Sequence, residues 1–148
     1  MKQYYSYDHF RDDISILLKE VRPFQAEAVI AVARGGLCMA HCMAEGLGLR
    51  EVQTIRTELY DNRSKRKEIT IFDHCSLCEV QKVLVVDDIA DSGETLQKVM
   101  EYLEGKYPDI EFQSATLFYK KTSVYKPHYW VQEANAWIEF FWEKDFNQ

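Results

Sequence analysis

Two short apolar runs, each followed by a turn of small and charged residues, most strongly constrain how this chain folds. The runs are AVIAVA (residues 28–33) and KVLVVD (residues 82–87), and both are rich in β-branched residues. Their apolar residues are consecutive rather than alternating, so we expect strands that are buried on both faces. Strands of this kind belong to parallel sheets with helices packed on both sides.

Helical periodicity is present before the first run and after both runs. Before the first run, apolar residues at helical spacing predict a helix that Asp8 caps and Pro23 ends. The small-residue segment LCMAHCMAEGL (37–47) predicts a second helix, which a following glycine closes. A third helix is expected to start at Ser92 and to end near Pro108.

Three more strands are predicted, over residues 52–59, 112–120 and 128–132. Strands and helices therefore alternate along the chain, without repeats or a linker. This pattern is typical of α/β proteins with a mostly parallel sheet, in one domain that spans residues 1–148.

Composition and charge exclude several classes of function. The 148 residues are 47% apolar, which fits a globular domain, and the formal net charge of −6 argues against nucleic acid or an anionic membrane as the partner. No apolar run approaches the roughly 20 residues of a membrane span, and the opening residues MKQYYSYDHF lack the apolar core of a secretory signal. We therefore expect a cytoplasmic protein that binds neither nucleic acid nor a membrane.

Four cysteines are present, and a cytoplasmic chain is expected to keep them reduced. Cys75 and Cys78, preceded by His74, have the spacing of metal ligands, but a single pair of this kind is a weak signal. Cys38 and Cys42 lie four residues apart on an apolar helix, where cysteine serves as a small core residue. The sequence leaves open whether the group of His74, Cys75 and Cys78 binds a metal.

The most polar part of the chain is residues 60–81, which contain a basic cluster of Arg63, Lys65, Arg66 and Lys67. Loops of this length in small domains are usually functional or disordered. Three interpretations therefore stay open: a hairpin, a flap that closes over a ligand, and a solvated charged loop.

Both apolar runs end in turns that suit an anionic ligand. ARGG (33–36) follows the first run and DDIADSGET (87–95) follows the second, and a helix is expected after each. Ligands of open α/β sheets bind at the carboxyl ends of the strands, where N–H groups at a helix N-terminus can hold phosphate. In the second turn Gly93 allows close approach, and Ser92 and Thr95 offer hydroxyl groups. A phosphate cradle is therefore predicted, with an ordinary helix N-cap as the alternative.

The adjacent carboxylates of Asp87 and Asp88 favour the ligand-binding interpretation. Two ionised carboxylates at a strand end repel each other unless a cation or hydroxyl groups meet them. The vicinal hydroxyls of a sugar are suitable partners, and so is Mg²⁺ carried by a polyphosphate. With a phosphate cradle one turn away, these residues describe a site for phosphoribosyl pyrophosphate (PRPP).

The stretch VLVVDDIADSGETL (83–96) resembles the PRPP signature of type I phosphoribosyltransferases: an apolar run, an acidic pair, two residues, Asp, Ser or Thr, Gly, any residue, and Thr. AVIAVARGGL (28–37) is similar to the pyrophosphate-loop strand of that family, and YDN (60–62) lies where the family's flap begins. Lys120 follows a strand as the family's purine-reading lysine does. WIEFFW (137–142) is similar to the tail of the bacterial xanthine-guanine enzymes, so the resemblance covers nearly the whole chain.

The resemblance implies the type I phosphoribosyltransferase fold: a mostly parallel sheet with flanking helices, a flexible flap and a small hood. It implies an enzyme of purine salvage that transfers the 5-phosphoribosyl group from PRPP to guanine, xanthine or hypoxanthine, with Mg²⁺ as cofactor and as a dimer or tetramer. Arg34 would be catalytic at the pyrophosphate, where the family often has a non-proline cis peptide bond. The residues expected to bind PRPP are Gly35, Asp87, Asp88, Ala90, Ser92, Gly93, Glu94 and Thr95, with Asp88 also close to the metal.

For the purine, the resemblance implies that Asp91 faces N7 as a general base and that Lys120 donates to the 6-oxo group. Such a lysine selects oxopurines over adenine, whose 6-amino group cannot accept this hydrogen bond. Trp137 would stack on the base, Ile138 would offer its backbone carbonyl to the 2-substituent, and Glu139 would lie near the metal.

Two departures from the family pattern leave details open. Lys121 follows Lys120 where the family often has proline, so either lysine could contact the base. Phe140 and Phe141 stand where the xanthine-guanine enzymes have a proline before the second tryptophan, so the preferred oxopurine is open.

Two other functions share parts of this pattern. A non-catalytic PRPP sensor of the same fold would be expected to add a nucleic-acid-binding domain or a basic face, whereas this chain has 148 residues and a net charge of −6. A receiver domain has its acidic pair after the first strand, whereas this pair comes late in the chain. The presence of Asp91, Lys120 and Trp137 also favours an enzyme over a sensor.

Overall fold

The computed structural model describes residues 1–61 and 67–147. The strands in these residues are β1 (Lys2–Tyr5), β2 (Ala28–Ala33), β3 (Val52–Asp61), β4 (Lys67–Asp73), β5 (Lys82–Ala90), β6 (Glu111–Tyr119), β7 (Tyr129–Glu133) and β8 (Trp137–Phe140). Within the described part of the chain, a six-stranded sheet has the order β4-β3-β2-β5-β6-β7, and a smaller sheet pairs β1 with β8. All neighbours run parallel except β3 and β4, which form an antiparallel hairpin.

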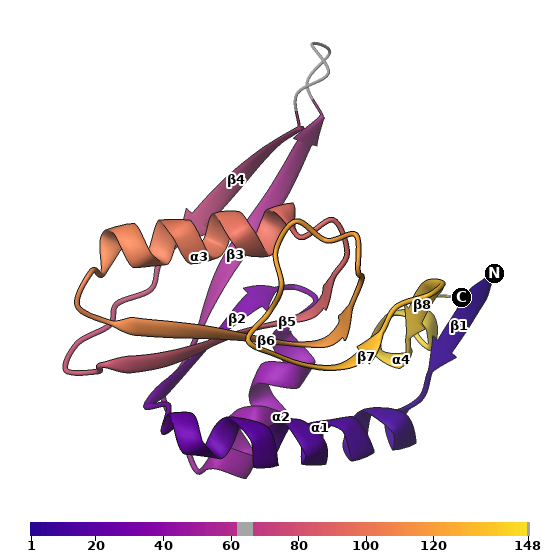
Figure 1. Ribbon diagram of the computed structural model, residues 1–148, viewed down its shortest axis with the longest axis horizontal. Coiled ribbons are helices and arrows are strands. Elements are labelled where there is room, and N and C mark those ends of the chain that lie inside the picture. The colour runs from indigo at the N-terminus through magenta and orange to yellow at the C-terminus, as the bar shows by residue number, and fades with distance from the viewer. Residues whose placement is uncertain (62–66, 148) are drawn as a thin grey trace.

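Helices cover both faces of the larger sheet, as Figure 1 shows. The helices are α1 (Tyr7–Val21), the 3₁₀ helix η1 (Arg22–Phe24), α2 (Leu37–Leu47), α3 (Glu94–Lys106) and the short α4 (Phe141–Lys144). α1 and α2 pack on one face and α3 packs on the other, while the hairpin of β3 and β4 extends beyond α3 (Figure 1). The two ends of the chain meet where β1 pairs with β8, and these strands with α4 form the small hood (Figure 1).

The α/β fold predicted from the sequence is confirmed, and two of its elements are predicted residue for residue. The strand over residues 28–33 and the helix over residues 37–47 have the expected bounds, and Gly48 closes that helix in the left-handed conformation. The predicted cap of α1 is wrong, because Ser6 rather than Asp8 is the N-cap. The Ser6 hydroxyl accepts a hydrogen bond from the His9 N–H at 3.2 Å, and Asp8 lies in the first turn.

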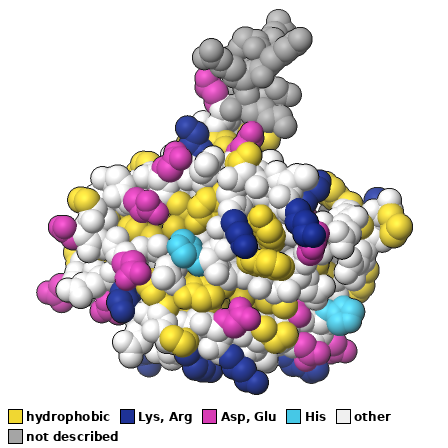
Figure 2. Space-filling view, viewed as in Figure 1, with side chains coloured by type: hydrophobic (Ala, Val, Ile, Leu, Met, Phe, Trp, Pro, Cys, Tyr) yellow, Lys and Arg dark blue, Asp and Glu magenta, His cyan; other side chains and the backbone are white. Residues whose placement is uncertain are grey.

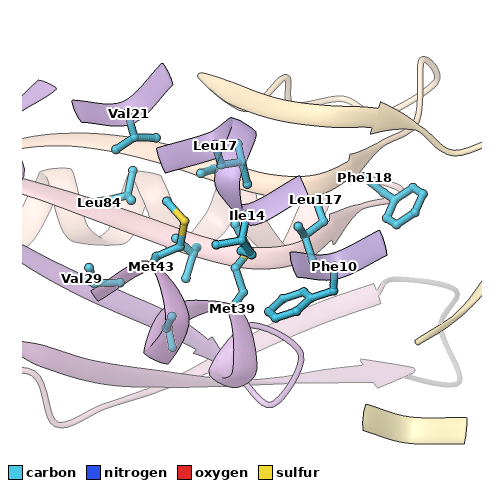
Figure 3. Packing of buried hydrophobic residues seen from close by; sticks show 14 of the residues in the cluster. Phe10, Ile14, Leu17, Val21, Val29, Met39, Met43, Leu84, Leu117 and Phe118 are labelled. Atoms are coloured by element: carbon cyan, nitrogen blue, oxygen red, sulfur yellow. The ribbon is translucent and has the colours of Figure 1, made fainter. Parts of the chain in front are cut away.

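Alternate residues of the central strand face opposite layers of the core. Leu84 and Val86 of β5 pack toward α1 and α2, whereas Val83 and Val85 pack toward α3, and all are fully buried. Figure 3 shows side chains of α1 and α2 pointing toward those of the sheet in the first layer. The labelled residues of this layer are Phe10, Ile14, Leu17, Val21, Val29, Met39, Met43, Leu84, Leu117 and Phe118.

Charged side chains of both signs lie on the molecular face seen in Figure 2, interspersed with apolar ones. Among the helices of the described residues, none is long and apolar enough to cross a membrane.

A buried polar network joins the hood to the main sheet. The Tyr5 hydroxyl of β1 donates to Asp13 Oδ2 of α1 at 2.6 Å, and the Gln132 amide of β7 donates to the same oxygen at 2.8 Å. Asp13 is only 6% exposed, so its carboxylate depends on these two donors. Segments from three distant parts of the sequence are therefore held at one buried oxygen.

We expect Tyr5→Phe to lower the free energy of unfolding by about 1–3 kcal/mol, because the buried carboxylate loses a hydrogen-bond donor. The matched control is Tyr4→Phe, whose hydroxyl donates to Asp145 on the surface and which should change stability little. Urea unfolding of both variants measures the difference. Equal effects of the two substitutions would contradict a special role for the buried network.

Candidate active site

The side chains expected to bind ligands gather at the carboxyl ends of the parallel strands. Arg34 and Gly35 follow β2, Asp91 follows β5, and Lys120 follows β6. The strand order reverses between β2 and β5, because the chain continues from β2 to β3 on one side and from β5 to β6 on the other. A reversal of this kind opens a crevice in which α/β proteins bind ligands.

Cavities at this edge of the sheet meet at Asp88, which lines each of them. The lysine cavity, of about 640 Å³, is lined mainly by Asp91, Lys120, Lys121 and residues 133–138. The arginine cavity, of about 900 Å³, lies beside Arg34 and Gly35 and is bounded by Thr57, Trp142, Glu143, Phe146 and Asn147. The turn cavity, of about 180 Å³, is lined by residues 87–93 with Thr95 and Leu96.

The acidic pair lies inside β5 rather than after it, which corrects the predicted end of this strand. β5 continues to Ala90, and Asp87 is paired with Thr116 of β6 in the sheet register. The Asp88 N–H donates to Asp87 Oδ1 at 2.8 Å. Pairing on both sides of Asp88, at Asp87 and at Ile89, therefore fixes the backbone that carries the two carboxyls.

Burial raises the pKa of both carboxyls. The pKa of Asp87 lies well above its usual range because of burial and then the charge of Asp88. Burial raises the pKa of Asp88 to about 6, and the charge of Glu143 acts in the same direction. The hydrogen bonds that these carboxyls accept do not offset the cost of burial for the ionised forms, which is the state expected of a site that meets a ligand.

The turn after β2 contacts the acidic pair directly. The Ala33–Arg34 peptide bond is cis, as the resemblance implied for this position. A Cβ atom on Gly35 would lie 2.6 Å from Asp88 Oδ2, so a side chain at this position would displace the carboxylate. Arg34 and Gly35 thus line the arginine cavity beside Asp87 and Asp88.

The turn after β5 positions the start of α3. Gly93 has a φ of 83°, and a Cβ atom there would overlap Ser123 Oγ, so this glycine is required by its backbone and by the neighbouring loop. From the sequence, Gly93 is expected only to let a ligand approach the backbone closely. Gly93 is the N-cap of α3 and the helix begins at Glu94, so Ser92 is not the helix cap, although its Oγ accepts a hydrogen bond from the Glu94 N–H at 3.3 Å. The turn cavity lies at this helix N-terminus, where Ala90, Ser92, Gly93 and Thr95 line it.

The residues expected to contact a base line the lysine cavity. Lys120 Nζ lies 3.4 Å from Asp91 Oδ1, and the two side chains are about half exposed. Trp137 is 67% exposed at the rim of this cavity, whereas Ile138 is buried. The structure therefore brings together Asp91, Lys120, Trp137 and Ile138, which are separated by up to 47 residues in the sequence.

The acidic residues of the tail are arranged differently from the expectation. In the described residues, Glu139 pairs with Lys144 at 3.4 Å and lies outside the lining of the lysine, arginine and turn cavities. Glu143, in α4, lines both the lysine and the arginine cavities. Sequence reasoning missed Glu143 because it lies beyond the WIE segment, and only its spacing of four residues from Glu139 could have indicated it.

Two predictions remain, one for the polar residues 60–81 and one for the group of His74, Cys75 and Cys78. Residues 60–81 include the end of β3 and all of β4, which pair as a hairpin, so this interpretation is confirmed. Arg63, Lys65 and Arg66 lie outside the described residues, and the closing flap stays a prediction. The Cys75 thiol donates to the Thr54 carbonyl at 3.3 Å, and burial raises its pKa to about 12. Across the described ranges, no group of three or more His, Cys, Asp and Glu side chains could hold a metal.

Comparisons with known proteins agree with this geometry. A family model for the phosphoribosyl transferase domain matches residues 3–147. The chain is similar to the xanthine-guanine-hypoxanthine phosphoribosyltransferase of Helicobacter pylori, with 35% identity and a TM-score of 0.91 over 98% of this chain and 96% of that one. The purine phosphoribosyltransferase of Pyrococcus horikoshii is 31% identical, with a TM-score of 0.84 over 96% and 93% of the two chains. The xanthine-guanine phosphoribosyltransferase of Idiomarina loihiensis is 29% identical over 122 residues, which are 80% of this chain and 72% of that protein.

The raised pKa values predict that the ligand-free protein loses stability as the acidic pair ionises. Because the pKa of Asp88 is about 6 in the folded state and near 4 in the unfolded chain, stability falls as pH rises from about 4 to 6. Asp88→Asn removes this charge, so it should raise the free energy of unfolding at pH 7 by up to about 3 kcal/mol.

Urea unfolding of ligand-free protein from pH 4 to pH 8 measures this effect, and the gain should shrink toward pH 4. Asp12→Asn is the control, because Asp12 is exposed on α1 and its substitution should produce no pH-dependent gain. An Asp88→Asn variant that is less stable than the original protein at pH 7 would show that the pair is satisfied without a ligand.

Proposed function

The chain belongs to the phosphoribosyl transferase domain family, and from this premise we propose that it transfers the 5-phosphoribosyl group of PRPP to a 6-oxopurine, with release of pyrophosphate. The acceptor is guanine, xanthine or hypoxanthine, which are the bases in the names of the similar enzymes. The observation that carries the proposal is the pairing of Asp91 with Lys120 at 3.4 Å on the wall of the lysine cavity.

This pair matches one edge of a 6-oxopurine. Guanine presents N7 and O6 side by side on the same edge. The Lys120 ammonium can donate to O6, and the adjacent Asp91 carboxylate can accept from an N7–H group. Adenine places a 6-amino donor opposite the lysine, so the pair favours oxopurines over adenine. Trp137 and Ile138 supply apolar surface beside this edge for the ring itself.

The other two cavities suit the remaining parts of PRPP. The ribose hydroxyls would donate to Asp87 and Asp88. The raised pKa values of these carboxyls agree with a site where further donors would stabilise the ionised forms. The 5′-phosphate would lie in the turn cavity at the N-terminus of α3, near Ser92 and Thr95. The pyrophosphate would lie in the arginine cavity beside Arg34.

Mg²⁺ fits the acidic pair as a cation that arrives with the polyphosphate. Mg²⁺ is commonly held by one or two carboxylates together with substrate phosphates, and Asp87 and Asp88 provide such a pair of oxygen ligands. The raised pKa values of both carboxyls agree with an acidic pair that a cation would stabilise. When bound, Mg²⁺ would neutralise charge on the pyrophosphate. Glu143 shares the lining of the lysine and arginine cavities with Asp88, whereas Glu139 pairs with Lys144, so Glu143 is the better candidate for a carboxylate near the metal.

The chain's own residues would then position the reactants. The purine N9 attacks C1′ of the ribose, the bond from C1′ to the pyrophosphate oxygen breaks, and its electron pair leaves with the pyrophosphate. Asp91 accepts the proton that N7 loses as the N9–C1′ bond forms. Arg34 lies where charge develops on the leaving group, so it would stabilise that charge.

The direct test incubates the protein with PRPP, Mg²⁺ and each of guanine, hypoxanthine, xanthine and adenine, and follows formation of the nucleoside monophosphate. We expect turnover with at least one oxopurine and little with adenine. If no oxopurine reacts while PRPP still binds, the protein is a sensor rather than an enzyme. Adenine as the best substrate would contradict the role given to Lys120.

Replacement of Asp91 separates base chemistry from donor binding. Asp91→Ala should lower kcat by about 100-fold because the proton on N7 loses its acceptor. The KM for PRPP should change less than about threefold, since other residues hold the phosphates. Asp109→Ala, an exposed aspartate after α3, is the control. Equal losses of kcat and of PRPP affinity in Asp91→Ala would place Asp91 in the PRPP site instead.

A further inference from the structure

The connection between β6 and β7 lies against the turn that precedes α3. It comprises residues 120–128, which contain neither helix nor strand, and Figure 1 shows it in orange beside the start of α3. The proposed function uses Lys120, the first residue of this connection. It assigns nothing to Ser123, three residues later, which lies outside the lining of the lysine, arginine and turn cavities in the described part of the chain.

Two backbone hydrogen bonds join this connection to the turn before α3. The Lys120 N–H donates to the Ala90 carbonyl at 3.1 Å, and the Val124 N–H donates to the Ser92 carbonyl at 2.8 Å. Asp91 lies between the two acceptors in the sequence, and its Oδ1 is 3.4 Å from Lys120 Nζ. The two segments are therefore fastened to each other at the place where the acid and the lysine meet.

Ser123 closes the turn that begins at Lys120. Its N–H donates to the Lys120 carbonyl at 2.9 Å, which defines a turn over residues 120–123, here called the lysine turn. The Ser123 hydroxyl donates to the Tyr125 carbonyl at 2.6 Å and accepts from the Tyr125 N–H at 3.3 Å. A Cβ atom on Gly93 would overlap Ser123 Oγ, so this hydroxyl packs directly against the backbone of the turn before α3.

This contact connects the two ends of one nucleotide. In the proposed function the 5′-phosphate lies at the N-terminus of α3, and Lys120 donates to O6 of the base. A ligand with two linked groups gains fully from both contacts only when the protein holds the two subsites at the distance that the ligand spans. The distance between the turn before α3 and Lys120 is therefore part of base recognition, and Ser123 lies between them.

We propose that Ser123 is a positioning residue that holds Lys120 at a set distance from the bound 5′-phosphate; this inference rests on the proposed function. Without its hydroxyl group, the lysine turn loses two hydrogen bonds to Tyr125 and its packing against Gly93. The Lys120 ammonium is then less well placed for O6 of a ligand that the phosphate anchors. The phosphate subsite itself keeps all its groups.

The test compares the Kd of inosine 5′-monophosphate with that of purine riboside 5′-monophosphate, which lacks O6, by isothermal titration calorimetry. We expect the Kd of the second nucleotide to be at least about 10-fold higher in the original protein, and we call this quotient the O6 ratio. In Ser123→Ala the O6 ratio should fall about three- to fivefold, because the lysine is no longer held in place. The Kd of ribose 5-phosphate should stay within about twofold, which also shows that the variant is folded.

A double variant separates positioning from a direct contact to the ligand. Lys120→Ala should remove most of the O6 ratio. A residue that acts only through Lys120 has no effect once that lysine is gone, so Ser123→Ala combined with Lys120→Ala should have the same O6 ratio as Lys120→Ala alone. Ser123→Cys, whose thiol is a weaker donor, should give an intermediate ratio and provides a second measurement at this position.

Two control variants test whether the effect is specific to this contact. Ser15→Ala is the same substitution at a hydroxyl that also donates to a backbone carbonyl, that of Arg11 on α1, and it should leave the O6 ratio unchanged. Tyr125→Phe removes the hydrogen bond between the Tyr125 and Ser114 hydroxyls but keeps the backbone groups that meet Ser123. It should also leave the ratio unchanged.

The results distinguish this proposal from the function on which it rests. If the original protein binds both nucleotides equally well, the role of Lys120 in the proposed function fails. If the original protein distinguishes them and Ser123→Ala keeps the full O6 ratio, or if the double variant differs from Lys120→Ala, the role of Ser123 is overturned. An equal loss of the O6 ratio and of ribose 5-phosphate affinity in Ser123→Ala would show a general disruption of the site and would also overturn it.

Discussion

The two adjacent carboxylates inside β5 are the constraint on which the site depends. Asp87 and Asp88 sit in a strand whose preceding residues are fully buried, and burial raises the pKa of both. Asp88 lines the lysine, arginine and turn cavities, and Asp87 lines the arginine and turn cavities. Burial of two adjacent carboxyls lowers stability, which agrees with the proposed ligand, whose hydroxyl groups and bound cation would meet them.

The backbone around this pair is adapted to it by glycine. At Gly35 a side chain would collide with the Asp88 carboxylate, and at Gly36 it would collide with the Val86 carbonyl of β5. The turn after β2 can therefore lie directly against β5, and this contact brings Arg34 to the same edge as the acidic pair. The position of the arginine cavity thus follows from Gly35 and Gly36, which let the turn lie against β5.

Much of the fold could be predicted because local sequence and burial agree. The strand at residues 28–33 and the helix at residues 37–47 are bounded by turn residues and filled with apolar ones, and both have the predicted bounds. β5 extends to Ala90, beyond the predicted end at Asp87, because pairing of Ile89 and Ala90 with β6 carries Asp88 into the sheet. β1 has one buried residue and exists through its pairing with β8, so the sequence around it carries little signal.

The site could be predicted where a contiguous motif encodes it, and less well where the tertiary fold assembles it. Glu133 and Glu143 reach the lysine cavity from β7 and from the tail, and neither lies in a motif. The position of Glu133 depends on the network in which Tyr5 and Gln132 both donate to Asp13, because Gln132 immediately precedes Glu133. The first strand of the chain therefore helps to place the wall of the cavity, although it contributes no residue to the lining. Substitutions near the N-terminus can for this reason alter the wall of this cavity without lying in its lining.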